Sequence, residues 1–193
     1  MNVSKLTRVS TLAIAIGLAV PVFAADEMSY TYLEGAYLDT EFDDGLDVDG
    51  DGLGLNGSVE ISSNVFLTAS YADQDFDFGV DLSQWSVGIG AHTPLADNLD
   101  LVGQLAYIDA EVDTRFGSLD DSGYGLGVGL RSRLAEVFEL EGGISYADLD
   151  DTGDDTSFNI GGRYYFTDGF AVGAGGSFGD DVTTWNANIR FEF

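Results

Sequence analysis

The strongest constraint on this chain is an alternation of apolar and polar residues with a period of two. A period of two places successive side chains on opposite faces of an extended strand. Ten runs of about ten residues show it, the length that a tilted strand needs to cross a bilayer. They are Ser29–Asp39, Gly52–Ile61, Val65–Asp73, Leu82–His92, Leu99–Asp109, Gly123–Arg133, Val137–Ala147, Ser157–Phe166, Phe170–Gly179 and Thr183–Phe193.

The connections between the runs alternate between short turns and longer acidic links. Pro94 falls in a connection, where its missing N–H does no harm. The short turns are Ser62–Asn64, Thr93–Asn98, Leu134–Glu136 and Thr167–Gly169, and the long links are Thr40–Asp51, Gln74–Asp81, Ala110–Ser122, Asp148–Thr156 and Asp180–Val182. Short turns on one side and long loops on the other are typical of an up-and-down membrane barrel. The pattern predicts an all-β, ten-stranded antiparallel transmembrane barrel, with eight strands as the alternative count.

The two faces of the runs distinguish a membrane barrel from a soluble one. One face carries large apolar side chains, while the other is mostly Gly, Ser and Asn, which suits a polar lumen better than a solvent-facing coat. Aromatic residues of the apolar face gather at two levels. Near the long links these are Tyr37, Tyr71, Trp85, Tyr107, Tyr124, Tyr146, Phe158, Phe178 and Trp185, and near the short turns Phe138, Tyr164, Phe166, Phe170, Phe191 and Phe193. Two such girdles are expected at the two membrane interfaces.

The first 24 residues read as a secretory signal peptide. Lys5 and Arg8 precede a short apolar stretch from Leu12 to Val20, and Val22-Phe23-Ala24 is a small-x-small cleavage site. We expect a mature barrel of residues 25–193 in the outer membrane of a Gram-negative bacterium, with both termini in the periplasm and the acidic loops outside. An uncleaved anchor is the alternative. The chain has no Cys and therefore needs no disulfides.

The charge balance of the chain is strongly acidic, with 34 acidic against 7 basic residues. Nucleic acid is therefore not expected as a partner, because phosphate contacts require clustered basic residues. The acids gather in the long links, where three interpretations stay open. They attract cations to a pore mouth, they share divalent cations with lipopolysaccharide phosphates, or they reflect a saline habitat.

Three aspartates in the first long link are weak candidates for a divalent cation. Asp47, Asp49 and Asp51 resemble the start of an EF-hand loop, but Ser58 stands where that motif needs a bidentate Glu. A solvated acidic loop is the alternative. No cofactor is expected.

Charged residues also occupy inward positions in the half of the barrel near the termini. A narrow lumen requires such charges to pair or to stay hydrated. We predict a constriction there, acting as a structural plug or a selectivity filter, beneath an outer half lined mostly by Gly, Ser, Asn and Gln. Its residues are Glu34, Glu60, Asp100, Arg131, Glu139, Glu141, Arg163, Arg190 and Glu192.

Several strand segments resemble a family of small, porin-like outer-membrane β-barrel proteins. They are Tyr30–Tyr37, Gly52–Ser58, Val65–Leu67 with Ser70–Ala72, Gln84–Gly90 and the closing aromatic strand. The resemblance implies an outer-membrane location, and some members have been connected with quorum-sensing-regulated secretion. It supplies no catalytic residues. The last strand, which ends on Phe193, resembles the signal read by the barrel-assembly machinery. Outer-membrane lipid and lipopolysaccharide are the other expected partners, and the oligomeric state stays open.

An enzyme is the least favoured class. Ten-stranded outer-membrane proteases use a His at the extracellular rim, whereas the single histidine, His92, falls beside a short turn at the opposite end. The leading prediction is a narrow passive channel for small or cationic solutes. The alternative is a non-conducting barrel with an envelope-structural or surface-interaction role.

Overall fold

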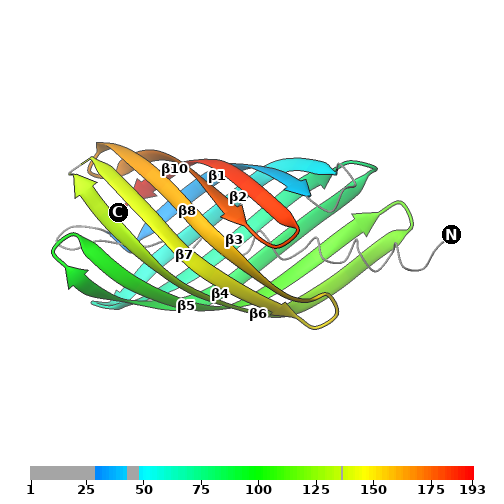
Figure 1. Cartoon of the computed structure of the whole chain (residues 1–193), viewed down its shortest axis with the longest axis horizontal. Helices are drawn as coiled ribbons and strands as arrows, with labels where there is room; N and C mark the ends of the chain where they lie inside the picture. Colours follow the sequence, from blue (N-terminus) through cyan, green and yellow to red (C-terminus); the bar gives the residue numbers. More distant parts are fainter. Residues whose placement is uncertain (1–28, 43–47, 136) are drawn as a thin grey trace.

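The computed structural model describes residues 29–42, 48–135 and 137–193, in which antiparallel strands wind obliquely around one barrel (Figure 1). Each strand pairs with its neighbours in the chain, and β1 pairs with β10 to close the barrel. The strands are β1 Tyr32–Phe42, β2 Asp49–Ser62, β3 Val65–Phe76, β4 Val80–Ala96, β5 Leu99–Thr114, β6 Gly117–Ala135, β7 Phe138–Leu149, β8 Gly153–Thr167, β9 Phe170–Phe178 and β10 Val182–Glu192. The predicted ten-stranded barrel is confirmed, and the eight-stranded alternative is wrong.

The two faces of the strands lie as their side chains require. On β4, Trp85, Val87 and Ile89 point outward and are exposed, whereas Gln84 and Ser86 are buried inside. Because the outer face is apolar and most of the inner face polar at these levels, the barrel has the polarity of a membrane protein.

The outer aromatics form contacts from strand to strand. We call the end of the barrel that carries the long acidic links the acidic end. Near it, the ring of Tyr107 lies 5.6 Å from that of Trp85 and 5.8 Å from that of Tyr124. At the other end, Phe170 lies 5.0 Å from Phe191 and 5.9 Å from Phe166. We call this second end the terminal end, because Phe193 lies there and its N–H donates to the carbonyl of Thr31 over 3.0 Å.

Several strands extend further at the acidic end than the sequence runs predicted. Most of the long links at Gln74–Asp81, Ala110–Ser122 and Asp148–Thr156 are regular strand, with tight turns at their tips. On β5 the alternation continues with its polarity reversed, because Asp109, Glu111 and Asp113 point outward and Ile108, Ala110 and Val112 point inward. Each predicted strand ended where its outward side chains were no longer apolar. This rule is wrong for the three links, because the strands continue through them with acidic side chains outward.

Pro94 also differs from its predicted position. It lies inside β4 rather than in a connection, next to a shift of register between Pro94 and Ala96. A bulge tolerates the missing N–H of proline, because the ladder hydrogen bonds are already interrupted there.

The predicted signal peptide, residues 1–24, lies outside the described residues. Within the described ranges, no helix is long and apolar enough to cross a membrane.

Candidate functional site in the barrel lumen

Buried arginines and glutamates form one layer of the lumen near the terminal end. The guanidinium of Arg163 on β8 lies 2.6 Å from Glu141, 3.1 Å from Glu34 and 3.2 Å from Glu139. The Nε of Arg190 on β10 donates to the same oxygen of Glu34 over 2.8 Å. Glu34 on β1 therefore joins two guanidiniums from strands on its own side of the barrel.

Arg131 on β6 completes this charged layer. It pairs with Glu139 on β7, and both side chains are fully buried. Its Nη2 also donates to the hydroxyl of Tyr165 over 3.0 Å, and that hydroxyl lies 2.7 Å from Glu192. Arg133 stacks on the ring of Tyr165 at 4.2 Å. With four arginines and four glutamates in contact, the charged layer is electrically balanced.

A second cluster lies at the terminal end beside the charged layer. The Tyr30 hydroxyl donates to Asp100 over 2.9 Å, and His92 Nδ1 lies 3.2 Å from the same oxygen. The ring of Tyr30 stacks on His92 at 3.6 Å and lies 4.9 Å from Phe66. Tyr30 precedes β1, so this cluster includes a residue that lies just before the first strand.

The predicted constriction residues therefore fall into three groups. Seven share the charged layer, namely Glu34, Arg131, Glu139, Glu141, Arg163, Arg190 and Glu192. Asp100 belongs instead to the cluster with Tyr30 and His92, and Glu60 is exposed near Thr31, whose hydroxyl accepts from the Glu60 N–H.

Sequence reasoning missed the aromatic residues of the lumen. Tyr30, Tyr32, Phe66 and Tyr165 are all buried inside. The alternation itself contained the signal, because Phe66 and Tyr165 stand at inward positions of their runs. Alternation gives the face of such a residue but does not distinguish an aromatic side chain that fills the lumen from one that only lines it.

The weak divalent candidates do not converge in the described structure. Asp49 and Asp51 lie on the outer face of β2 and are exposed, and Asp47 lies outside the described residues. Among the residues that the structure describes, no three or more His, Asp or Glu side chains are grouped to hold a metal ion.

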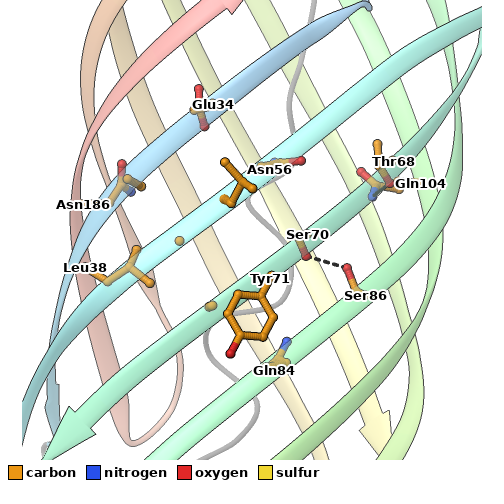
Figure 2. Close-up of a pocket in the computed structure, with 14 residues that line it drawn as sticks. Glu34, Leu38, Asn56, Thr68, Ser70, Tyr71, Gln84, Ser86, Gln104 and Asn186 are labelled. Atoms are coloured by element: carbon orange, nitrogen blue, oxygen red, sulfur yellow. Dashed lines mark hydrogen bonds between the residues drawn. The ribbon is translucent and has the colours of Figure 1, made fainter.

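Amides and hydroxyls line the middle of the lumen. Gln104 donates to Thr68 over 2.9 Å, and the hydroxyls of Ser70 and Ser86 lie 2.7 Å apart (Figure 2). Two cavities of about 80 and 70 Å³ lie at this level, and both are lined by Glu34, Leu38 and Asn186. We call the two adjoining cavities the polar chamber.

An apolar layer occupies the lumen at the acidic end. Its buried members come from four strands and pack against Phe42, Val48 and Val80; they are Phe76, Leu82, Ile108, Ala110, Val112, Ala147 and Leu149. The expectation of an outer half lined mostly by small and polar residues holds for the polar chamber and is wrong above it. The lumen thus has a charged layer, a polar chamber and an apolar layer in sequence.

A closed antiparallel barrel with an apolar outer face, two aromatic girdles and a polar lumen defines an integral membrane β-barrel. The model of the outer membrane protein β-barrel domain matches residues 10–166 of the chain. The chain therefore belongs to that family and is a protein of the outer membrane. Among curated proteins, none matches the chain.

Solved structures with the same fold have little sequence in common with the chain. An outer membrane channel from Pseudomonas putida F1 is 12% identical with a TM-score of 0.55, over 91% of this chain and 97% of that one. The β domain of the Bordetella autotransporter BrkA is 11% identical with a TM-score of 0.53, over 84% and 99%. The translocator domain of the autotransporter NalP from Neisseria meningitidis is 11% identical with a TM-score of 0.51, over 98% and 96%. At such identities the likeness concerns the fold alone.

Proposed function

We propose that this barrel is a narrow passive channel for small polar solutes, which the described side chains hold closed at two levels. The observation that carries the proposal is the polar chamber between the charged and apolar layers. Each buried amide that lacks a hydrogen-bond partner lowers the stability of the fold. Such amides would therefore not be expected if the lumen side chains served stability alone.

The acidic end supports a preference for cations during approach to the channel. Five aspartates lie directly opposite one another on consecutive strands, in the order Asp39, Asp51, Asp75, Asp81 and Asp113. We call this row the aspartate ladder. Its side chains point outward from the barrel, so it acts on solutes near the mouth and does not line the lumen.

We also propose how the barrel is oriented in the outer membrane and which partners it contacts. The acidic end faces outward, next to lipopolysaccharide, and the termini lie in the periplasm after removal of residues 1–24, as the short turns at the terminal end favour. The barrel-assembly machinery recognises the last strand, in which Ile189, Phe191 and Phe193 are exposed on the outer face.

Planar-bilayer recording tests the channel. Folded protein, checked by heat-modifiable gel mobility, is expected to give rare discrete openings with cation selectivity. Arg163→Ala is expected to change their size, because its guanidinium contacts three glutamates of the charged layer. Silence from well-folded protein would overturn the channel.

The alternative is a non-conducting barrel that acts through its surface. Complete burial of Arg131, Glu139 and Arg190 favours it, because paired charges inside a narrow barrel leave no path for ions. If folded protein gives no current steps in planar bilayers, that result supports this second function.

A further inference from the structure

The polar chamber contains hydrogen-bond acceptors that no described group uses. Asn56, Gln84 and Gln104 line the first cavity and Asn188 lines the second, and the side-chain oxygens of these four residues have no hydrogen-bond partner among the described residues. Gln84 is only 3% exposed and Asn188 only 7%. Buried polar atoms of this kind nearly always have a partner, so the chamber is built for an occupant that donates hydrogen bonds.

The amide nitrogens of the same side chains are partly engaged within the protein. Gln104 Nε2 donates to Thr68, and Asn188 Nδ2 donates to Asn186 over 2.8 Å. These bonds hold the amides of Gln104 and Asn188 in place and leave their oxygens without a partner among the described residues. Asn56 lies on β2, Gln84 on β4 and Gln104 on β5, and Figure 2 shows their side chains around the first cavity.

The charge around the chamber favours a neutral occupant. Glu34, which lines both cavities, already accepts from Arg163 and Arg190. Glu34 is therefore not available to neutralise a bound cation. A bound anion would be repelled by the amide oxygens that have no partner. A neutral donor pays neither electrostatic cost.

The size of the chamber limits the occupant to a few heavy atoms. Its cavities of about 80 and 70 Å³ are well below the roughly 300–1,000 Å³ of pockets that hold drug-sized ligands. Gly175 lines the second cavity and preserves this space, since a methyl group on it would lie 3.1 Å from Asn186 Nδ2. The volume suits a short polyol better than a sugar chain or a peptide.

We propose that the polar chamber is a binding site for a small neutral polyol, held by the amide oxygens of Asn56, Gln84, Gln104 and Asn188. This inference rests on the proposed function for its biological meaning, because it names the solute class of the channel. The binding itself is independent of conductance.

Retention of labelled erythritol during folding tests the site. The protein is refolded in detergent with the label, excess is removed by gel filtration, and the label per folded chain is counted. Wild-type protein is expected to retain about one molecule. The double variant Gln84→Leu with Gln104→Leu is expected to retain at least tenfold less, because two of the four acceptors proposed to hold the polyol are lost.

Gln74→Leu is the matched control. Gln74 is an equally buried inward amide, but it lines neither cavity and contacts Thr40. It is expected to retain the label. No retention by folded wild-type protein, or equal retention by the double variant, would overturn the site and leave the chamber to water.

Liposome swelling separates the site from the channel. Retention together with saturable erythritol entry supports both proposals. Retention without entry of any solute keeps the site and removes the channel. Entry at similar rates for erythritol, a butanediol and a four-carbon carboxylate, without retention, keeps the channel and removes the site.

Discussion

Glu139 is the residue on which the charged layer depends most. It is fully buried and lies within ion-pair distance of Arg131, Arg133 and Arg163. Glu139→Gln removes the charge that compensates these guanidiniums, and breaking one partner of a buried pair costs about 3–5 kcal/mol. We expect urea-induced unfolding in detergent to show a loss of that size.

Glu60→Gln is the control for this prediction. Glu60 was predicted in the same constriction but is exposed at the terminal end. Its replacement is expected to change stability by no more than about 0.5 kcal/mol. Similar losses in the two variants would show that the charged layer does not stabilise the barrel.

The sequence predicted which charges enter the lumen but not which ones meet. Alternation assigns a face to each residue, and its place in a run assigns a height. The contact between Arg163 on β8 and Glu34 on β1 spans two intervening strands, so it depends on the barrel's closure and on side-chain reach. Tyr30 lay inside the predicted run Ser29–Asp39, but alternation does not show that its hydroxyl meets Asp100.

The reversal of polarity along β5 indicates where the membrane ends. Leu105 and Glu111 lie on the same outer face, on either side of the girdle residue Tyr107. Leu105→Arg places a charge in the apolar band and is expected to cost about 2–4 kcal/mol if it lies near the bilayer midplane. Glu111→Arg is expected to cost little. Urea titration of both variants in lipid vesicles makes the comparison, and an equal cost would mean that lipid also covers the extension.

The aspartate ladder is a local electrostatic cost that the extended strands tolerate. Asp81 lies directly opposite both Asp75 and Asp113, and like charges in that position destabilise a strand pair. Asp81→Asn is expected to raise the midpoint of thermal unfolding, and more so at low ionic strength, because salt screens exposed charges. Asp168→Asn, in the turn between β8 and β9, serves as the control. A gain that is independent of salt would contradict the electrostatic explanation.

Sequence reasoning found the existence, order and direction of all the strands but shortened those at the acidic end. The reason lies in what the outer face must contact. Within lipid it must be apolar, whereas beyond the girdle water allows acids outside and apolar residues inside, as in a soluble barrel. Asp109–Asp113 keeps the period of two through this change. The period of two, taken alone, predicts that β5 continues beyond Asp109. The hydropathy of the outward side chains wrongly predicts that the strand ends there.

At the scale of the whole molecule, the apolar layer lies between the polar chamber and the acidic end. Leu82, Ile108 and Leu149 are almost completely buried in it, at 1%, 2% and 2% exposure. Hydrophobic constrictions close pores by excluding water, so polar side chains at this level favour a hydrated, open state. A shift of about 1.4 kcal/mol between closed and open states changes their ratio tenfold.

Leu82→Ser combined with Ile108→Ser is therefore expected to raise the open fraction in planar bilayers by about tenfold or more. Leu95→Ser is the matched control, because Leu95 is exposed near the terminal end of β4. Heat-modifiable mobility shows whether each variant is folded. If folded double variant opens no more often than wild type, the apolar layer does not limit conduction, and the charged layer must do so, since it closes the lumen at the other level.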